Sequence, residues 1–529
     1  MTKVEVFDTT LRDGAQARGI SFSVKDKIAI TQALDEFGID FIEAGNPGSN
    51  PKDLEYFELV KNVELKTSKL VAFGSTRRKD IKAEEDQNLL SLLKADTEYV
   101  AIFGKSWDFH VTDIIKTDLE NNLEMIKDTI LFLTSKGKKV IFDAEHFFDG
   151  YKSNPEYAVK ALVAAKEGGA EVLALCDTNG GCFPEEITKI IKNIRNRLGD
   201  VKIGVHVHND MGFGVINSIA AIEAGAVQVQ GTFIGFGERC GNANLSTIIA
   251  NLQLKKDYEL VPQEKMPMLT SIAREVAEIS NTVIEDGTPY IGKNAFAHKG
   301  GMHIDGVSKA PHSFEHINPE KIGNEREFLL SEVSGRSTIL EVINRVDKSI
   351  DRDSEATRGI IERLKELEYQ GYQFEGAKAT FELVIRKYLG KYKPFFDLVY
   401  FDVKGNYIGT KYYSTAVVKV MVKEQIELKV AEGDGPVNAL DKALRMALER
   451  FYPELKEMHL IDYKVRVLKG EENATAAKVR VLIESSDGKN SWTTIGVSTD
   501  IIEASWIALV DSIEYKLIQE TLKRLRDLG

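Results

Sequence analysis

The chain has 529 residues, of which 43% are hydrophobic and 28% are charged, and its formal net charge is -12. This length allows two or three domains with complete cores, and the acidic balance argues against a general nucleic-acid-binding protein, which normally presents a basic face. Three cysteines are too few for a disulfide framework, and the sequence shows neither a signal peptide nor a membrane-spanning run of about 18 apolar residues. We therefore expect a soluble cytoplasmic protein that binds neither nucleic acid nor membrane.

Short apolar segments alternate with longer amphipathic segments through residues 1–265. Eight of the apolar segments have the length and composition of buried strands: 4–8, 39–43, 70–74, 99–103, 139–143, 171–176, 201–207 and 226–232. Between them, 25–37 and 156–168 carry apolar residues at helical spacing. Strand–helix alternation implies a parallel sheet, and eight such units in about 250 residues predict a (β/α)8 TIM barrel, with a doubly wound open sheet as the alternative.

Carboxylates and histidines follow the ends of several predicted strands. They occur at Asp8 to Asp13, Glu43, Asp143 to His146, Asp177 to Asn179 and His206 to Asp210. In such a barrel the carboxyl ends of the strands form one face, where the reactive groups of enzymes lie. Ionisable residues at so many strand ends are costly unless they face a common polar site, so their placement favours a closed barrel.

Two histidines one residue apart, His206 and His208, end the seventh predicted strand. Side chains two positions apart on a strand point to the same side, so both imidazoles can reach one point. If the barrel closes, Asp13 from the segment after the first strand can join them on a single cation. One oxygen and two nitrogens suit Mg²⁺, Mn²⁺, Zn²⁺ or Co²⁺ at an open catalytic site, whereas two histidines satisfied by backbone partners are the alternative.

Three further residues near these strand ends carry side chains that can bind an anion or transfer a proton. Arg12, beside Asp13, can hold a keto-acid carboxylate or a developing alkoxide, or it can form a structural ion pair. Glu145 can act as a general base in a partly dry pocket. Thr178 can donate its hydroxyl to a substrate carboxylate, or it can cap a turn.

The segment 235–244, G-F-G-E-R-C-G-N-A-N, is a glycine-rich loop after the eighth strand. Such a loop can cradle a phosphate or a cofactor, although this one lacks the lysine of a Walker A motif. Within it, Cys240 can be a nucleophile, but we expect a buried, inert thiol. The basic run R-R-K at 77–79 can meet the phosphates of coenzyme A or form a solvated face.

Beyond the predicted barrel, the pattern of the chain changes twice. Residues 266–384 have a helical pattern, with a glycine-rich interruption at 292–306. Residues 385–529 contain a weak duplication of strands, a glycine turn and an amphipathic helix, and the two copies end in the segments 432–444 and 496–509. A helix start after a glycine turn can bind a carboxylate, so the pair suggests an α+β regulatory domain with a ββα-type repeat. A plain α+β dimerisation domain is the alternative.

Four motifs resemble those of the DRE-TIM metallolyase family and occur in the same order: D-T-T-L-R-D-G at 8–14, H-V-H-N-D at 206–210, G-E-R-C-G-N-A-N-L at 237–245 and H-K-G-G-M-H at 298–303. Within that family the chain is most similar to the Claisen-condensing synthases for isopropylmalate, homocitrate and citramalate. The G-D-G-P-V-N-A-L string and the 496–509 segment resemble the regulatory domain of isopropylmalate and citramalate synthases. The long citramalate synthase branch is most similar in four strings, at 72–79, 103–110, 143–152 and 175–181.

The resemblance implies an acyltransferase reaction and a set of partners. Acetyl-CoA condenses with pyruvate, thioester hydrolysis releases (R)-citramalate and coenzyme A, and the product feeds isoleucine biosynthesis. The resemblance also implies a homodimer and feedback inhibition, with isoleucine as the expected effector of the duplicated C-terminal domain. The alternatives are a synthase for isopropylmalate or homocitrate, a hydroxymethylglutaryl-CoA-type lyase that uses a loop cysteine, and a barrel retained as a sensor module.

The resemblance also assigns roles to particular residues. It places a divalent metal (Mg, Mn, Zn or Co) on four ligands: Asp13, His206, His208 and Asn242. Arg12 binds the substrate and stabilises the alkoxide, Glu145 acts in the acid–base steps, and Thr178 holds the keto-acid carboxylate. His298 reaches the site of the partner subunit. Relatives often have a tyrosine where this chain has Phe314, so a hydroxyl role there is lost or passes to another group.

Overall fold

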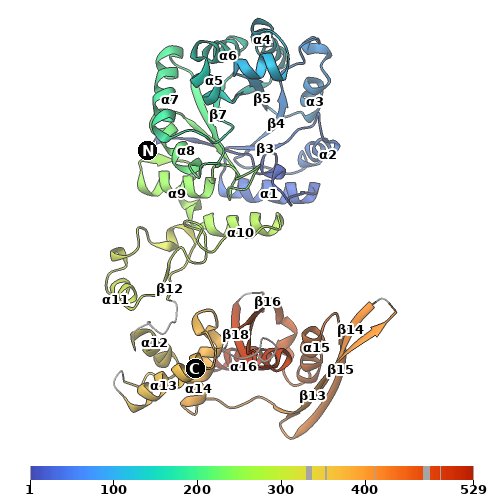
Figure 1. Ribbon diagram of the computed structural model, residues 1–529, viewed down its shortest axis with the longest axis vertical. Coiled ribbons are helices and arrows are strands. Elements are labelled where there is room, and N and C mark those ends of the chain that lie inside the picture. Colours follow the sequence, from blue (N-terminus) through green and yellow to red (C-terminus); the bar gives the residue numbers. More distant parts are fainter. Residues whose placement is uncertain are drawn as a thin grey trace. The chain divides into compact units, whose positions relative to one another are not determined.

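The computed structural model describes residues 2–328, 336–351, 354–409, 411–468, 477–488 and 490–527. The chain divides into two compact units (Figure 1), one formed by Met1–Phe296 with His316–Arg326 and the other by Ala297–Glu315 with Glu327–Gly529. Parts of the predicted helical region 266–384, and Ala476 at the start of the second predicted repeat, lie outside the described residues. The domain boundaries expected near 265 and 384 stay predictions.

Eight parallel strands of the first unit close into a barrel, as the sequence predicted. The strands are β2 (Glu5–Asp8), β3 (Phe41–Gly45), β4 (Lys69–Ser75), β5 (Tyr99–Lys105), β6 (Lys139–Glu145), β7 (Val172–Asp177), β8 (Lys202–Val207) and β9 (Gln228–Gly231). Each pairs with the next in the chain, and β9 pairs with β2 to complete the ring, with Asp8 opposite Gly231. The ring rules out the doubly wound open sheet.

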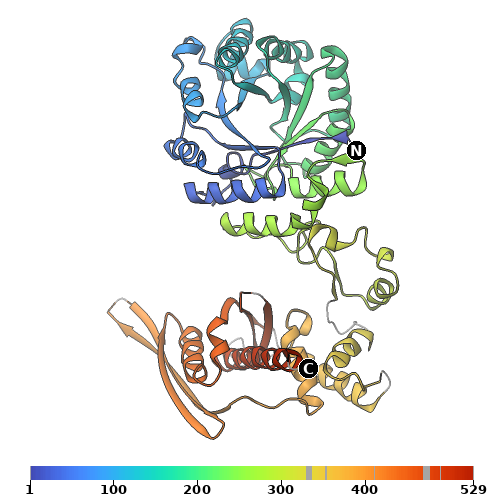
Figure 2. The same ribbon diagram turned by 180° about the vertical axis from the view of Figure 1, so that it is seen from behind.

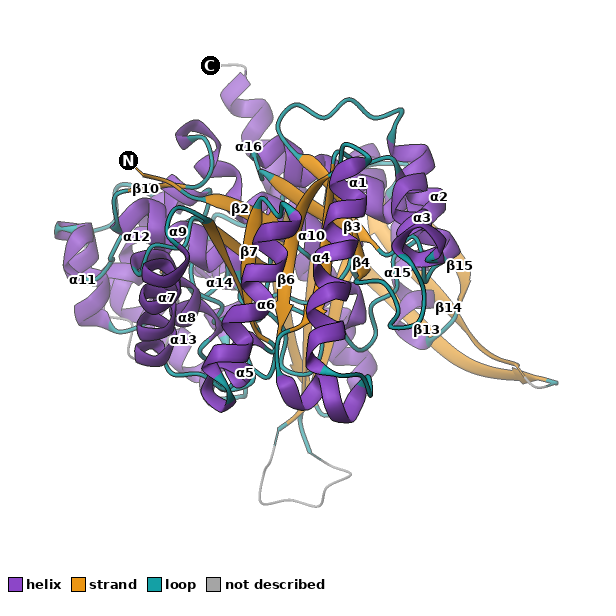
Figure 3. Cartoon of the chain, turned by 90° about the horizontal axis from the view of Figure 1, so that it is seen from above, coloured by secondary structure: helices purple, strands orange, loops and turns teal. Residues whose placement is uncertain are grey.

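Helices surround the barrel strands (Figure 3) and follow them in the order expected of β/α units. They are α1 (Val24–Phe37), α2 (Pro51–Val60), α3 (Gln87–Ala95), α4 (Leu119–Ser135), α5 (Phe147–Ser153), α6 (Pro155–Gly168), α7 (Pro184–Leu198), α8 (Gly214–Glu223), α9 (Leu245–Lys255) and α10 (Leu269–Ile279). Local signals fix their ends: Ser23 and Asp26 form a capping box at α1, and Gly38 ends that helix in a left-handed conformation. The segments 25–37 and 156–168, predicted as helices, correspond to α1 and α6.

The barrel has two hydrophobic cores. A large cluster lies between the strands and the helices, where it includes Ile42, Val100 and Val205. A smaller cluster belongs to the alternate strand positions: Phe7, Phe41, Val71, Tyr99, Ala101, Ile141, Val172 and Ala174. Side chains two positions apart share a face, so the same face becomes polar toward the carboxyl ends of the strands, for instance at Asp143 and Glu145 on β6. The polar carboxyl end of this inner face is where a site can form.

The second unit begins with helical segments and ends in two sheets. Its helices are α11 (Gly301–Lys309), α12 (Arg336–Val346), α13 (Glu355–Tyr369) and α14 (Lys378–Tyr388), and β11 (Ala297–His298) pairs with β12 (Glu327–Phe328). Among the helices of the described residues, none is both long and apolar enough to span a bilayer.

The C-terminal duplication appears as two sheets, each with a helix (Figure 2). The first copy is β13 (Asp397–Ile408), β14 (Lys411–Val422), β15 (Gln425–Gly433) and α15 (Pro436–Leu448), and the second is β16 (His459–Val467), β17 (Val479–Ser486), β18 (Ser491–Ser498) and α16 (Ile501–Asp527). Each copy therefore has three antiparallel strands, one more than the expected ββα unit. The turn between β14 and β15 consists of Lys423 and Glu424, both with positive φ (46° and 66°). Such turns usually carry Asn or Gly, so neither residue marks this turn in the sequence.

Candidate active site at the carboxyl end of the barrel

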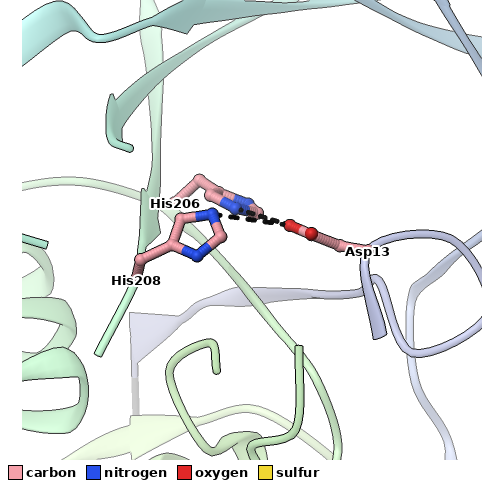
Figure 4. A group of neighbouring side chains, drawn as sticks. All are labelled: Asp13, His206 and His208. Carbon is pink, nitrogen blue, oxygen red and sulfur yellow. Dashed lines mark ion pairs between the residues drawn. The ribbon is translucent and has the colours of Figure 1, made fainter. Parts of the chain in front are cut away.

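The structure brings Asp13, His206 and His208 together at the carboxyl end of the barrel (Figure 4). Asp13 follows β2, His206 lies near the end of β8, and His208 directly follows that strand. Oδ2 of Asp13 lies 3.1 Å from Nε2 of His206 and 3.7 Å from Nε2 of His208. All three side chains are buried, and their candidate ligand atoms lie within 4.8 Å of one another. One oxygen and two nitrogens thus converge as ligands of a single divalent cation must.

A chain of hydrogen bonds behind His206 orients its ring. Nδ1 of His206 lies 3.1 Å from Oε1 of Gln230, and Nε2 of Gln230 donates to Oδ1 of Asp143 at 3.3 Å. Because an amide oxygen only accepts, Nδ1 of His206 carries the hydrogen, and Nε2 is the nitrogen that faces Asp13. Metal-binding histidines commonly have such a partner on the second nitrogen, so this arrangement fits a ligand role.

Asn242 completes the cluster from the loop after β9. Its backbone forms an isolated bridge with His208, and its Nδ2 lies 2.9 Å from Oδ2 of Asp13 and 3.2 Å from Nε2 of His206. Its Oδ1 is buried and has no hydrogen-bond partner among the described residues. A half-turn of the amide would direct that oxygen to the point where the other ligand atoms converge. The unpaired oxygen therefore fits an oxygen-seeking divalent cation.

Local charges set the protonation of this cluster. Burial by itself raises the pKa of Asp13, but the Arg12 guanidinium and His206 hold that pKa well below its usual range. Burial opposes the charged form of His206, yet its contact with Asp13 raises the pKa of the ring. Burial and the neighbouring His206 lower the pKa of His208 to about 4. The cluster thus holds a carboxylate and at least one neutral imidazole at neutral pH, which are the ligand forms that cations bind.

Arg12 forms an ion pair, which was the alternative, structural role predicted for it. It also approaches Asp13 of the ligand cluster. Its Nε donates to Oε2 of Glu43 at 2.6 Å, and its Nη1 lies 3.6 Å from Oδ2 of Asp13. The guanidinium carbon lies 3.8 Å from the centre of the Phe73 ring, which stacks on Phe103. Burial raises the pKa of Glu43 to about 7 even though Arg12 opposes the shift. Arg12 is therefore held between an acid and an aromatic wall, with one edge toward Asp13.

Glu145 and Thr178 lie at the ends of neighbouring strands. Glu145, the last residue of β6, forms an ion pair with Lys105, the last residue of β5. Thr178 follows β7, and its Oγ1 accepts a hydrogen bond from the backbone N–H of His146 at 2.9 Å. This bond matches the turn role of Thr178, but it leaves the hydroxyl hydrogen free to donate to a ligand.

Arg239 joins three loops at this end of the barrel. Its Nε and Nη2 donate to the two carboxylate oxygens of Asp210, both at 2.8 Å, and Nη2 also donates to the carbonyl of Thr178 at 2.7 Å. Asp210 lies two residues after His208, and Arg239 lies three residues before Asn242. A bidentate arginine fixes geometry as well as charge. Arg239 therefore links the segments that carry Thr178, His208 and Asn242.

Other residues singled out from the sequence lie outside the ligand cluster. His298 belongs to the second unit, where its Nε2 lies 3.1 Å from Oε1 of Glu315, and its role at the site stays a prediction. Arg77 donates to three backbone carbonyls of its own loop and forms an ion pair with Asp128, so its guanidinium stabilises that loop. Cys240 is exposed, contrary to our expectation of a buried thiol. It lies in a turn between two residues with positive φ, Arg239 and Gly241.

Lys105, Gln230 and Arg239 also lie at this end of the barrel and were not predicted from the sequence. Lys105 lies two residues after Phe103, and Gln230 lies two residues before Thr232. Side chains two positions apart on a strand point to the same face, so this spacing places Lys105 and Gln230 on the inner face of the barrel. That signal was present for both, but their partners depend on the register between strands. Arg239 lies on a loop, where no periodicity applies.

Three family models match the chain in sequence order. The HMGL-like model matches residues 3–283, the homocitrate synthase post-HMGL domain-like model matches 290–371, and the LeuA allosteric (dimerisation) domain model matches 375–517. The chain is 51% identical over 523 residues to the (R)-citramalate synthase of Aquifex aeolicus, with 98% of both chains covered. It is 49% identical over 528 residues to the (R)-citramalate synthase of Synechocystis sp., covering 98% of this chain and 96% of that one. It is 32% identical over 511 residues to the probable 2-isopropylmalate synthase of Methanopyrus kandleri, covering 97% of this chain and 98% of that one.

Proposed function

This chain belongs to the HMGL-like family, and because it shares almost its whole length with (R)-citramalate synthases, we propose that it condenses acetyl-CoA with pyruvate and hydrolyses the thioester to give (R)-citramalate. The observation that carries the proposal is 51% identity through 98% of both chains, which includes the barrel and the C-terminal domain alike. The cluster of Asp13, His206 and His208 supports it, because a ketone must be polarised before a carbon nucleophile can add.

The barrel residues divide the chemistry among them. A divalent cation (Mg²⁺, Mn²⁺, Zn²⁺ or Co²⁺) held by Asp13, His206, His208 and Asn242 would supply Lewis-acid polarisation of the ketone. Glu145 takes a proton from the methyl group of acetyl-CoA, and the carbon adds to the ketone of pyruvate. Arg12 stabilises the alkoxide that results. Thr178 donates its hydroxyl hydrogen to the keto-acid carboxylate.

The aromatic wall beside Arg12 supports a small keto acid. Phe73 and Phe103 stack with ring centres 5.3 Å apart, and Arg12 lies against Phe73. Pyruvate carries only a methyl group beyond its carbonyl, whereas 2-ketoisovalerate needs room for an isopropyl group. Large rings next to the guanidinium that meets the substrate oxygen favour the smaller side chain.

A panel of 2-keto acids tests the proposed function. Wild-type protein, acetyl-CoA and a divalent metal are mixed with pyruvate, 2-ketobutyrate, 2-ketoisovalerate or 2-ketoglutarate, and free thiol and product are measured. We expect the highest kcat/KM with pyruvate and a product that matches (R)-citramalate on a chiral column. Faster turnover of 2-ketoisovalerate or 2-ketoglutarate would assign the chain to isopropylmalate or homocitrate synthesis instead.

The C-terminal unit supports a regulated homodimer. The match to a LeuA allosteric (dimerisation) domain and the glycine turn before α15 motivate inhibition by isoleucine, and His298 is then the residue that serves the other subunit's site. The second predicted glycine turn was wrong, because Gly496 lies within β18 and the side chain of Asp500 caps the start of α16. At Gly435, the N-cap of α15, an added Cβ meets no described atom within 4 Å. We expect Gly435→Leu to fill the effector position and abolish inhibition by isoleucine while kcat is retained. Inhibition equal to that of the wild type would reject this position.

The remaining proposals concern organisation and location. We assign residues 1–265 to catalysis, 266–384 to a helical linker and 385–529 to regulation. The three cysteines Cys176, Cys182 and Cys240 are all free thiols, which suits a reducing cytoplasm. A biosynthetic role in the isoleucine pathway follows from the product that the enzyme is proposed to make.

A further inference from the structure

A lysine and the proposed base, Glu145, form a close pair at the carboxyl end of the barrel. Lys105 is the last residue of β5, Glu145 is the last residue of β6, and the two lie directly opposite each other in the parallel register. Nζ of Lys105 contacts Oε2 of Glu145. Their side chains are only 17% and 25% exposed, so the pair is sheltered from much of the screening that weakens surface ion pairs.

The backbone on both sides of this pair is held in place. Nδ2 of Asn122 donates to the carbonyl of Lys105 at 2.9 Å, and Oγ of Ser106 donates to the carbonyl of Glu145 at 2.7 Å. A Cβ on Gly150 of α5 would lie 2.7 Å from the carbonyl oxygen of Ser106, so the helix packs directly on the segment after Lys105. The lysine is therefore placed by the scaffold and does not depend on its own flexible stem alone.

The surroundings of the pair connect it to the rest of the site. On one side, Nζ of Lys105 lies 5.7 Å from the centre of the Phe103 ring, and that ring stacks on Phe73 beneath Arg12. On the other side, the ring of His110 lies 4.3 Å from the ring of His146, the residue after Glu145. Burial and the charge of His146 lower the pKa of His110, and Asp149 is the acid that pairs with His146. Lys105 is thus the cation in contact with Glu145.

We propose that Lys105 is a positioning residue for Glu145. The ammonium holds Oε2, so that Oε1 is the oxygen aimed at the methyl group of acetyl-CoA. In the step concerned, the C–H bond of the methyl group breaks, the proton moves to Oε1 of Glu145, and the electron pair stays on the carbon that then adds to the ketone. Lys105 keeps its own proton throughout. This inference rests on the proposed function, because it takes Glu145 as the base of that reaction.

Lys105→Met tests the inference, because methionine retains most of the stem and removes the charge. We expect kcat to fall by about 10- to 100-fold, with KM for pyruvate changed by less than about twofold, because misplacement of a base slows proton transfer without removing a keto-acid contact. We expect the deuterium isotope effect measured with methyl-deuterated acetyl-CoA to increase, since proton removal becomes more rate-limiting. Lys105→Arg should recover part of kcat.

A double-mutant cycle separates this role from general structural damage. In the Glu145→Gln background, Lys105→Met should cause no further loss of kcat, because a residue that acts through Glu145 has nothing left to position. Lys202→Met is the matched control, since Lys202 pairs with Glu5 and Glu171 at the start of β8, the opposite end of the barrel. That variant should keep wild-type kcat. Lys105→Gln replaces the Met variant if the latter does not fold.

Two results would overturn the inference. They are an equal loss of kcat from Lys105→Met in the presence and absence of the Glu145 carboxylate, and an unchanged isotope effect in a folded Lys105→Met protein. Wild-type protein is measured in the same assays, so that a failure of the proposed function can be distinguished from a failure of the Lys105 inference. If it turns over another keto acid faster than pyruvate, the proposed product is wrong, but removal of the methyl proton is the same step and the Lys105 comparison is then made with that keto acid.

Discussion

The barrel and the C-terminal sheets depart from the usual distribution of residues in opposite ways. The carboxyl end of the barrel buries ionisable groups, among them Asp13, Glu43 and His206. The C-terminal unit instead exposes apolar side chains, including Leu428 and Val430, which are 50% and 53% exposed. Burying charge costs desolvation, and exposing apolar surface forgoes the hydrophobic effect. The two departures point to chemistry in the first region and to association in the second.

Four of the exposed apolar residues of this unit lie on one face of the sheet formed by β13, β14 and β15. In the register of β14 and β15, Val417 opposes Val430, Lys419 opposes Leu428 and Met421 opposes Ile426. The intervening positions of β14 are buried apolar residues in the core that includes α15: Ala416, Val418, Val420 and Val422. We call the exposed set of Met421, Ile426, Leu428 and Val430 the open face, and it is the surface through which we expect the proposed homodimer to form.

The largest expected effect comes from removing one proposed metal ligand, which tests whether the buried ionisable groups of the barrel serve catalysis. His208→Ala takes away one of the three groups that converge on the cation, so we expect kcat/KM to fall by about 10³-fold or more, since Lewis-acid stabilisation is worth several kcal/mol. Elemental analysis should show a matching loss of bound metal. The exposed His459 on β16 provides the control, because His459→Ala should change neither quantity. Full activity of the wild type after exhaustive chelation would contradict the metal role.

A charge placed on the open face tests the second region. We expect Leu428→Lys to weaken the dimer by about 10²-fold, because a charge buried in an apolar interface is costly and central apolar contacts dominate such interfaces. Analytical ultracentrifugation over a range of concentrations measures this change. Gln425→Lys, on the same strand but paired with the buried Val422, adds the same charge away from the open face and should leave the dimer intact. A dimer that is equally stable in both variants would move the interface elsewhere.

Substitution of Arg239 tests whether the link between the barrel loops depends on the hydrogen-bond geometry of the guanidinium or only on its charge. Arg239→Lys keeps the positive charge but cannot donate to both oxygens of Asp210 and to the carbonyl of Thr178 at once. We expect it to behave like Arg239→Gln, with kcat/KM for pyruvate about tenfold below that of the wild type. Steady-state kinetics of both variants decide the question. Wild-type kinetics for the lysine variant would mean that charge alone suffices.

The smallest expected effect concerns Glu514, a buried acid in the C-terminal unit. Its burial shows that this unit, like the barrel, places an ionisable group away from solvent. Oε1 of Glu514 accepts the N–H of Phe395 at 3.0 Å, and Oε2 has no hydrogen-bond partner among the described residues. The titratable groups near it are Lys387, Tyr392, Tyr452 and Asp511. Burial raises the pKa of Glu514 to about 7 from its ordinary 4.5. The folded state therefore holds this proton more tightly, so its stabilising contribution is complete below pH 4.5 and is lost as pH rises through 7.

Glu514→Gln mimics the protonated form and should remove this pH dependence. We expect the variant to be more stable than the wild type by about 1 kcal/mol at pH 8, less than the full shift because an amide reproduces a carboxylic acid imperfectly. At pH 4.5 the difference should vanish. Thermal unfolding at the two pH values measures it, with the exposed Glu432→Gln as the control. The same difference at both pH values would show that the effect is not one of ionisation.

The sequence predicted the barrel better than the C-terminal sheets for a physical reason. A parallel strand buried on both faces is a continuous apolar run, and all eight runs became strands of the ring. Strands with one exposed face have a weaker pattern, and the turn at Lys423 and Glu424 lacks the residues that usually mark a hairpin. At the site, His206 and His208 were predictable because they lie two positions apart where β8 ends. The approach of Asn242 to Asp13 depends on a loop and on closure of the ring, which no local spacing encodes.

The pairing of β9 with β2 joins the last strand of the barrel to the first, and the proposed metal ligands lie on both sides of that junction. Asp13 follows β2, whereas Asn242 follows β9, and the amide of Asn242 lies 2.9 Å from the Asp13 carboxylate. A chain emerging from the ribosome thus carries an incomplete set of ligands until more than 240 residues have been made. Tight loading of the metal therefore has to wait until the junction forms, and the loaded ion would fasten the two ends of the barrel together. Metal supply during synthesis then becomes a factor in how much folded protein accumulates.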